Sequence, residues 1–324
     1  MVKVAIAGAT SAIAQDVIEQ ILAKNKHEVI AFTRQSEAAA YISKPVAEPE
    51  ANRVHWIQVD YHNDASLQEA LRGVEVVLCF YSGAEAVEAI EAQKCLIDAC
   101  IAAGVKRYAP AEWASNCESS FSSYAFKKDV RKYLQEVNKE RQVLEYTLFQ
   151  PGLFMNYFAH PHQTTKHWST TRMYIDLDNR RALCAGDGNY PITLTTVEDM
   201  AGVIAEALDY QGKWPVVGGI RGTHTTLAEL IELSQAIRGT MKVEKLSPQD
   251  LAAGELKASW YPIFEHRAIP PSLQDQVSRN GTIEFLLSAA DGSWAVSDEW
   301  NKLLPEYRFT TAEEYLKAVW EGKP

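Results

Sequence analysis

Hydrophobic positions in the first half of the chain form short continuous runs, separated by segments with helical periodicity. The runs comprise residues 3–8, 27–34, 54–60, 74–81, 105–113 and 144–152. The helical segments between them comprise residues 11–22, 64–73, 84–103 and 123–140. Apolar strands that alternate with helices are typical of a parallel sheet with helices on both faces. The pattern therefore predicts an α/β fold with a doubly wound parallel sheet.

The pattern changes after Gly152. An aromatic, irregular stretch is followed over 173–209 by strands and turns that lead to a helix, and the apolar run 214–219 could return a strand to the main sheet. Short helices are expected at 226–239, 247–258 and 311–322. We therefore expect a dinucleotide-binding domain of the Rossmann type over 1–152. Residues 153–324 should form a smaller, partly interleaved substrate lobe near the carboxyl ends of the strands, where open α/β sheets bind ligands.

Composition excludes several classes of function. The 324 residues are 47% hydrophobic and 23% charged, as in globular proteins, and no apolar run reaches the roughly 20 residues of a membrane helix. The chain enters a strand at once, without a signal-peptide pattern, so a cytoplasmic protein is expected. A net charge of −10 disfavours nucleic acid and leaves a small molecule as the expected partner.

Cysteine and histidine patterns do not indicate a metal site. The five cysteines are scattered through apolar segments without a C-x-x-C pair, which predicts reduced, mostly buried thiols. His160, His162 and His167 are close in sequence but lack the helical i, i+4 spacing or a cysteine partner that zinc sites commonly show. We expect a flexible lid here and no bound metal.

The first strand runs into a turn with the sequence VAIAGATSAIA. In a dinucleotide site this turn usually holds three glycines, whose positions are occupied here by Gly8, Ser11 and Ala14. Ala14 adds one methyl group at the packing contact, whereas the Cβ of Ser11 would crowd a phosphate, although its hydroxyl could donate to it. The turn predicts a pyrophosphate site formed by Gly8 and the following residues, namely Thr10, Ser11, Ala12 and Ile13. A tight turn without a ligand is the structural alternative.

The end of the second strand indicates the choice of cofactor. A site for NAD usually places Asp or Glu here, but this strand ends in Thr33 and Arg34. A guanidinium can pair with the 2′-phosphate of NADP(H), unless it is only a solvated surface group. Asp60, which closes the third run, either contacts the adenine or caps a turn.

Six stretches, in this order, resemble the NmrA-like and isoflavone-reductase-like branch of the atypical short-chain dehydrogenases. They are KVAIAGATSAIA (3–14), VIAFTR (29–34), WIQVDYHND (56–64), KRYAPAEWAS (106–115), YAFKKDVRKYL (124–134) and YTLFQPGLFMNYF (146–158). The resemblance implies a Rossmann domain, NADP(H), and reductase activity on aromatic or secondary-metabolite substrates. The branch also contains regulators that bind the dinucleotide without turning it over.

Catalytic candidates come from the stretch 124–134. Short-chain dehydrogenases commonly pair a tyrosine acid with a lysine four residues later, a spacing that Tyr124 and Lys128 satisfy. The isoflavone-reductase-like branch instead has a single lysine in a K..VR pattern, which selects Lys127. We prefer Lys127, which would bind the nicotinamide ribose or support proton delivery. The alternative is that these lysines only solvate a charged helix face.

Substrate contacts are expected from two further segments. Glu112 follows the fifth strand and could orient the lysine or the ribose, or serve as a capping partner. Phe154 and Tyr157 offer flat apolar surface suited to an aromatic substrate, unless they belong to the core. The sequence thus predicts an NADPH-dependent reductase of a small, aromatic or secondary-metabolite carbonyl, enone or imine, monomeric or homodimeric. A dinucleotide-sensing regulator is the alternative.

Overall fold

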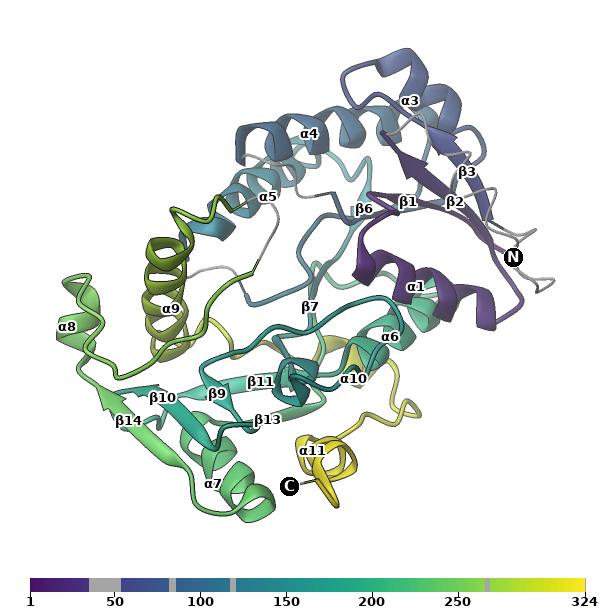
Figure 1. The fold of residues 1–324 in the computed structure, drawn as a ribbon. Coiled ribbons are helices and arrows are strands. Elements are labelled where there is room, and N and C mark those ends of the chain that lie inside the picture. The colour runs from purple at the N-terminus through teal and green to yellow at the C-terminus, as the bar shows by residue number, and fades with distance from the viewer. Residues whose placement is uncertain (35–53, 82–85, 117–120, 266–268, 324) are drawn as a thin grey trace.

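The N-terminal half is built around a six-stranded parallel sheet with the order β3-β2-β1-β4-β5-β6 (Figure 1). Its strands are β1 (Lys3–Ala7), β2 (Glu28–Thr33), β3 (Val54–Gln58), β4 (Val76–Cys79), β5 (Arg107–Ala109) and β6 (Glu145–Tyr146). The computed structural model describes residues 1–34, 54–81, 86–116, 121–265 and 269–323. Every ladder of this sheet is parallel, so the predicted doubly wound fold is confirmed.

Helices cover both faces of this sheet. On one face lie α1 (Ala12–Ala23) and α6 (Val197–Asp209), and on the other lie α3 (Asp64–Ala70), α4 (Ala86–Ala103) and α5 (Ala125–Val137). The side chains of β1 alternate between these layers: Val4 and Ile6 pack towards α1, whereas Ala5 and Ala7 pack towards α4. Both faces are apolar for this reason, which explains the uninterrupted hydrophobic runs of the sequence.

The chain returns to this half after Gly152, but the strand expected within 214–219 does not join the six-stranded sheet: it forms a separate two-stranded sheet. Strand β7 (Leu148–Gln150) follows β6 after Thr147, and β12 (Val217–Gly219) pairs with β7 in parallel. Helix α6 packs against α1, and the two lie side by side in Figure 1. Residues beyond 152 therefore contribute a strand and a helix to the packing around the main sheet.

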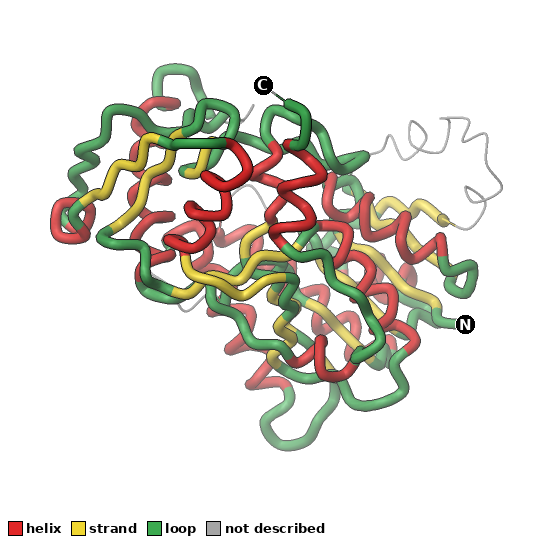
Figure 2. The backbone as a smooth tube through the Cα atoms, turned by 90° about the horizontal axis from the view of Figure 1, so that it is seen from below, coloured by secondary structure: helices red, strands yellow, loops and turns green. Residues whose placement is uncertain are grey.

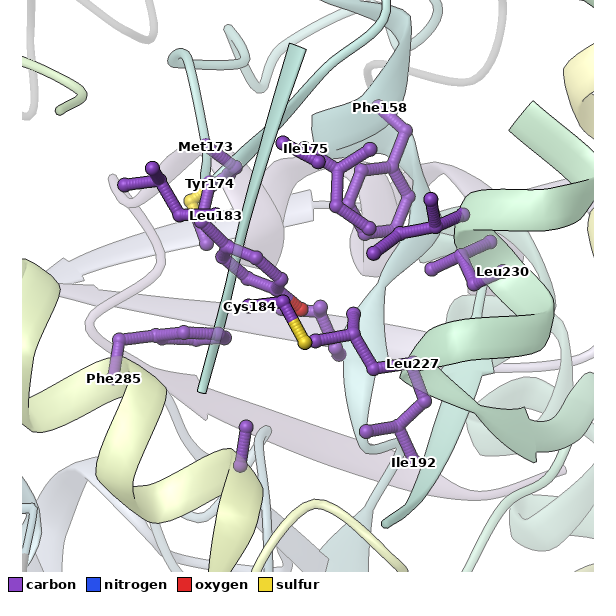
Figure 3. Packing of buried hydrophobic residues seen from close by; sticks show 14 of the residues in the cluster. Phe158, Met173, Tyr174, Ile175, Leu183, Cys184, Ile192, Leu227, Leu230 and Phe285 are labelled. Carbon is purple, nitrogen blue, oxygen red and sulfur yellow. The ribbon is translucent and has the colours of Figure 1, made fainter. Parts of the chain in front are cut away.

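The remaining C-terminal segments form a second lobe with two three-stranded sheets, β14-β10-β9 and β13-β11-β8. Its elements are β8 (Leu153–Phe154), η3 (Met155–Ala159), β9 (Ile175–Asp176), β10 (Arg181–Ala185), β11 (Pro191–Thr195), β13 (Thr223–Thr226), α7 (Leu227–Arg238), β14 (Lys242–Leu246), α8 (Pro248–Ala252), α9 (Gln274–Ala290) and α11 (Ala312–Trp320). Helix α10 (Glu299–Leu303) instead contacts β12 and places Trp300 in the core that α1 and α6 share. Figure 3 shows Phe158, Tyr174 and Leu183 in the core of this lobe. The chain termini lie apart, the N-terminus beside the six-stranded sheet and the C-terminus beside α11 (Figures 1 and 2).

Helix α9 is a long element that the hydrophobic pattern does not predict. Its buried face includes the hydroxyl residues Ser278, Thr282 and Ser288, which read as polar positions in the sequence. Each hydroxyl donates to a carbonyl three or four residues earlier in the helix, at 2.6 to 2.8 Å, so burial leaves no hydroxyl unsatisfied. The predicted helix at 247–258 is shorter than expected, because α8 ends before Gly254, which has a φ of +79°.

The cysteines that the structure describes are free thiols at positions 79, 95, 100 and 184. Burial raises the pKa of Cys79 to about 12, so this thiol stays protonated and unreactive. Cys117 lies outside the described residues. Across the described ranges, no helix combines the length and the apolar character needed to cross a membrane.

Candidate active site

The turn after β1 has the geometry of a phosphate-binding turn. Gly8 has a φ of +73°, and a Cβ at this position would lie 2.7 Å from the main-chain nitrogen of Tyr81. Glycine is therefore required both by conformation and by the close approach of the end of β4. Ala14 is fully buried where α1 meets the sheet, in the position predicted for helix packing.

Ser11 has a local role that the sequence did not reveal. It is the N-cap of α1, and its Oγ accepts a hydrogen bond from the amide of Ala14 at 3.3 Å. Thr10 is exposed beside it, and Ala12 and Ile13 form the first turn of the helix. Amides in a first turn have no acceptor within the helix, so those that a cap does not bind can hold an anion at the helix N-terminus. The turn thus fits the pyrophosphate of a dinucleotide.

A pocket of about 400 Å³ lies beside this turn, at the carboxyl ends of β2, β3 and β4. It brings together two residues that the sequence singled out, Arg34 and Asp60. Its other lining residues are Gln58, Val59, Tyr61, His62, Ser66, Tyr81 and Glu88. The hydroxyl of Tyr61 accepts a hydrogen bond from the amide of Gly8 at 3.2 Å, which connects the pocket to the turn. The pocket therefore lies where the adenosine half of a dinucleotide would extend from the pyrophosphate site.

Arg34 is held by two residues that sequence analysis missed. Its Nη1 donates to Oε1 of Glu88 at 2.7 Å, and its guanidinium lies over the ring of Tyr81, 4.7 Å from the centroid. Tyr81 also donates its hydroxyl to Glu88 at 2.5 Å, and burial together with this carboxylate raises the pKa of Tyr81 to about 12. Tyr81 ends the fourth hydrophobic run, which is the only sequence signal for it.

Asp60 has features of both alternatives that the sequence left open. Its Oδ1 accepts from the amide of His62 at 2.9 Å, so the carboxylate caps a turn. The residue is exposed and lines the same pocket as Arg34, so it stays a candidate contact for an adenosine group.

Lys127 is a buried cation at the carboxyl edge of the sheet. Only 6% of the residue is exposed, and Nζ donates to the main-chain oxygen of Glu112 at 2.5 Å. The ammonium also lies 3.8 Å from the centroid of the Tyr124 ring, a cation–π contact. Lys128, in contrast, is only partly buried. Of the two lysines, Lys127 is the one held against Tyr124 and the turn after β5.

The carboxylate of Glu112 is bound within the protein. Arg131 donates to both of its oxygens, from Nε at 2.8 Å and from Nη2 at 2.7 Å, and only 1% of Glu112 is exposed. This geometry favours a role for Glu112 in orienting the lysine over a direct contact with substrate. Arg131 is the arginine of the K..VR pattern, so the motif contained a signal for this pair.

Tyr124 lies at the junction between the short helix η2 (Ser122–Tyr124) and α5. Its ring packs against Phe121, and it lies near Trp294 of the C-terminal lobe, with ring centroids 4.8 and 6.4 Å away. The hydroxyl of Ser122 donates to Glu284 of α9, which joins the same junction to the second lobe. Trp294 and Glu284 of the second lobe therefore lie beside Tyr124 and Ser122 at this junction.

Phe154 and Tyr157 form a separate aromatic cluster with Trp168. Phe154 is buried in the core to which α1 and α6 contribute, and the Trp168 ring lies edge-on to both residues, at 5.5 and 4.7 Å between centroids. Burial raises the pKa of Tyr157 to about 12, so its phenol stays neutral. Packing accounts for Phe154, while Tyr157 is the more accessible of the two.

The three clustered histidines have different partners. Nε2 of His167 lies 2.7 Å from Glu19 of α1, the ring of His162 packs against Trp320, and Nδ1 of His160 lies 3.3 Å from the carbonyl of Thr170. Nowhere in the described ranges do three His, Cys, Asp or Glu side chains meet in a group that could hold a metal ion.

The six-stranded order and the glycine turn at the first strand define a nucleotide-binding protein of the Rossmann type. A family model for the NmrA-like family matches residues 2–316, and the chain belongs to this family. It is 26% identical over 320 residues to the oxidoreductase BOA1 of Botryotinia fuckeliana, covering 95% of this chain and 97% of that protein. It is 23% identical to the oxidoreductase swnN of Metarhizium robertsii, covering 100% and 98%.

Solved structures share the fold along the whole chain. AtPrR2 with NADP+ and (+)-pinoresinol has a TM-score of 0.70 at 18% identity, covering 98% of both chains. An isoflavone reductase has a TM-score of 0.69 at 20% identity, also covering 98% of both. The NADPH complex of a quinone oxidoreductase from Escherichia coli has a TM-score of 0.66 at 22% identity, covering 98% of this chain and 100% of that one. The predicted family is confirmed, and the relatives agree with the predicted class of NADP-dependent oxidoreductase.

Proposed function

We propose that this protein is an NADPH-dependent reductase of a small aromatic or secondary-metabolite carbonyl, enone or imine. The observation that carries the proposal is the buried ammonium of Lys127, fixed at the carboxyl edge of a Rossmann sheet beside an aromatic ring. The oxidoreductase class is shared by the curated relatives, and three of the similar structures hold NADP+, NADPH or NADP(H).

The cofactor half of the site rests on the turn at Gly8. The amides of the first turn of α1 would hold the pyrophosphate, and Arg34 would pair with the 2′-phosphate. When bound, NADPH supplies the hydride. The protein's part is to place the nucleotide, orient the substrate and supply a proton.

Lys127 is the group suited to support that proton transfer. Reduction of a carbonyl or imine places negative charge on the substrate oxygen or nitrogen, and a fixed ammonium stabilises that charge as it develops. Its hydrogen bond to Glu112 and its contact with Tyr124 hold Nζ in one orientation. Tyr124 is the candidate acid, and Lys127 would also bind the nicotinamide ribose.

The side chains around Tyr124 support an aromatic substrate. Phe121, Tyr124 and Trp294 present aromatic rings from both lobes within one cluster. Flat apolar rings favour a flat apolar ligand, which they contact by stacking or edge-on. AtPrR2, one of the structural relatives, was solved with (+)-pinoresinol, an aromatic compound.

The test measures NADPH oxidation by the purified protein with a panel of aromatic ketones, enones and imines. The loss of NADPH absorbance reports the reaction. Aliphatic analogues of matched size are the control panel. We expect turnover with at least one aromatic class and weaker turnover with its aliphatic analogue. Tight NADPH binding without oxidation by any panel member would contradict the reductase and favour a dinucleotide-sensing regulator.

A further inference from the structure

The guanidinium of Arg34 is already bound to a carboxylate. We propose that Glu88 is a second determinant of cofactor choice: it competes with the 2′-phosphate of NADPH for Arg34 and accepts a hydrogen bond from the 2′-hydroxyl of NADH. The protein would then use both cofactors, with a smaller preference for NADPH than Arg34 alone would give. This inference rests on the proposed function, because it concerns the same dinucleotide site.

Hydrogen bonds from Arg34 and Tyr81 hold Glu88 at this position. Its Oε1 accepts from Nη1 of Arg34 at 2.7 Å and from the hydroxyl of Tyr81 at 2.5 Å. Glu88 also lies in the first turn of α4, where the helix dipole favours a negative charge. The ring of Tyr81 stacks on Tyr61, with centroids 4.9 Å apart, and Tyr61 accepts from the amide of Gly8. The carboxylate is therefore connected by contacts to the phosphate-binding turn itself.

Electrostatics gives Glu88 opposite effects on the two cofactors. A phosphate monoester carries about −1.5 to −2 charges at pH 7, so a neighbouring carboxylate repels it. The phosphate must also displace or share a guanidinium nitrogen that Glu88 now occupies. A ribose hydroxyl instead donates a hydrogen bond, and an ionised carboxylate is a strong acceptor for it.

The topology of the sheet explains why the sequence alone does not indicate Glu88. NAD-binding Rossmann proteins usually place the acid at the end of the second strand, which here carries Arg34. Glu88 comes from α4, after the strand that lies on the other side of β1. Asp60 is the other carboxylate that lines the pocket, and its Oδ1 is bound to the amide of His62.

The experiment measures dissociation constants of NADPH and NADH by calorimetry for the full chain and for Glu88→Gln. The glutamine keeps the shape and removes the charge. Because the pair is half exposed, with 53% and 33% of its side chains accessible, we expect moderate effects. NADPH should bind about three- to tenfold more tightly and NADH about threefold more weakly.

Two matched variants separate this effect from general charge removal. Glu91 is exposed and lies one turn further along α4. Glu91→Gln should therefore leave the dissociation constants of NADPH and NADH unchanged. Asp60→Asn removes a charge from the same pocket and should not reverse the preference. Arg34→Ala should weaken NADPH about tenfold or more, and the gain from Glu88→Gln should shrink in that background, because the competition requires the guanidinium.

Unchanged constants in Glu88→Gln would overturn the inference. Weaker NADPH binding would also overturn it, since Glu88 would then position Arg34 for the phosphate. An equal gain in Asp60→Asn would assign the effect to the pocket's total charge. Failure of the proposed function has a different signature, because the parent protein would then bind neither nucleotide or would oxidise NADPH with no substrate.

Discussion

Two arginine–glutamate pairs of equal length lie at opposite ends of the candidate site. Arg34 binds Glu88 and Arg131 binds Glu112, both at 2.7 Å. The side chains of the first pair are 53% and 33% exposed, whereas those of the second are 12% and 1% exposed. Water screens the first pair, so a ligand can exchange with it at little cost to folding. The second pair is a fixed support for the turn that holds Lys127.

The largest effect is expected from Arg131→Met. This change keeps much of the volume and leaves the Glu112 carboxylate buried without its cation. Loss of one partner of a buried pair costs about 3–5 kcal/mol, and the slight exposure of Arg131 favours the lower end, about 3 kcal/mol. Urea unfolding, followed by fluorescence, should show the midpoint shift to lower concentration.

Lys132→Met is the control for this change. It removes the next cation of α5, whose ion pair with Asp129 has side chains 77% and 51% exposed, so the free energy of unfolding should change very little. Glu88→Gln should likewise leave stability almost unchanged. Equal destabilisation by Arg131→Met and Lys132→Met would remove the distinction between the two pairs.

The next effect concerns activity at the buried end. Lys127→Met keeps the stem and removes the ammonium, so nucleotide affinity should change by no more than about tenfold. Turnover should fall by on the order of a hundredfold or more, since the charge matters most when negative charge develops on the substrate. Steady-state rates of NADPH oxidation and calorimetric binding together separate the two quantities.

Lys128→Met is the matched control, one residue further along the same helix and only partly buried. It should retain nearly full activity. A normal turnover number in Lys127→Met would exclude a catalytic role for Lys127. A loss of turnover confined to Lys128→Met would assign that role to Lys128.

Much of the fold was predictable because both faces of the sheet are buried. Residues 3–152 therefore show continuous apolar strands that alternate with helical segments. The glycine turn and Arg34 were predictable because the first two strands carry them in sequence order. Glu88 was not, since its relation to Arg34 depends on the crossover that brings α4 beside the end of β2. Helix α9 was not predicted because hydroxyl residues on its buried face read as polar positions. In the structure these hydroxyls donate to carbonyl groups of the helix itself.

Glu112 shows a different limit of sequence reasoning. Its type and place after the fifth strand suggested a group that faces a ligand. The structure gives its two polar parts separate partners: the carboxylate binds Arg131 and the carbonyl binds Lys127. Sequence spacing cannot distinguish these roles, because a main-chain oxygen leaves no trace in residue identity.

The smallest expected effect is at the exposed end, at Ser11. Its Oγ caps α1 through the amide of Ala14, and glycine at an N-cap costs only a few tenths of a kcal/mol, whereas alanine costs about 1 kcal/mol. Ser11→Gly should therefore unfold almost like the parent and bind NADPH as well or better, because it removes the Cβ near the phosphate. Ser11→Ala should lose stability while retaining affinity. If Ser11→Gly stays folded but binds NADPH at least about tenfold more weakly, about 1.4 kcal/mol, the hydroxyl is a phosphate ligand and its role as a cap is secondary.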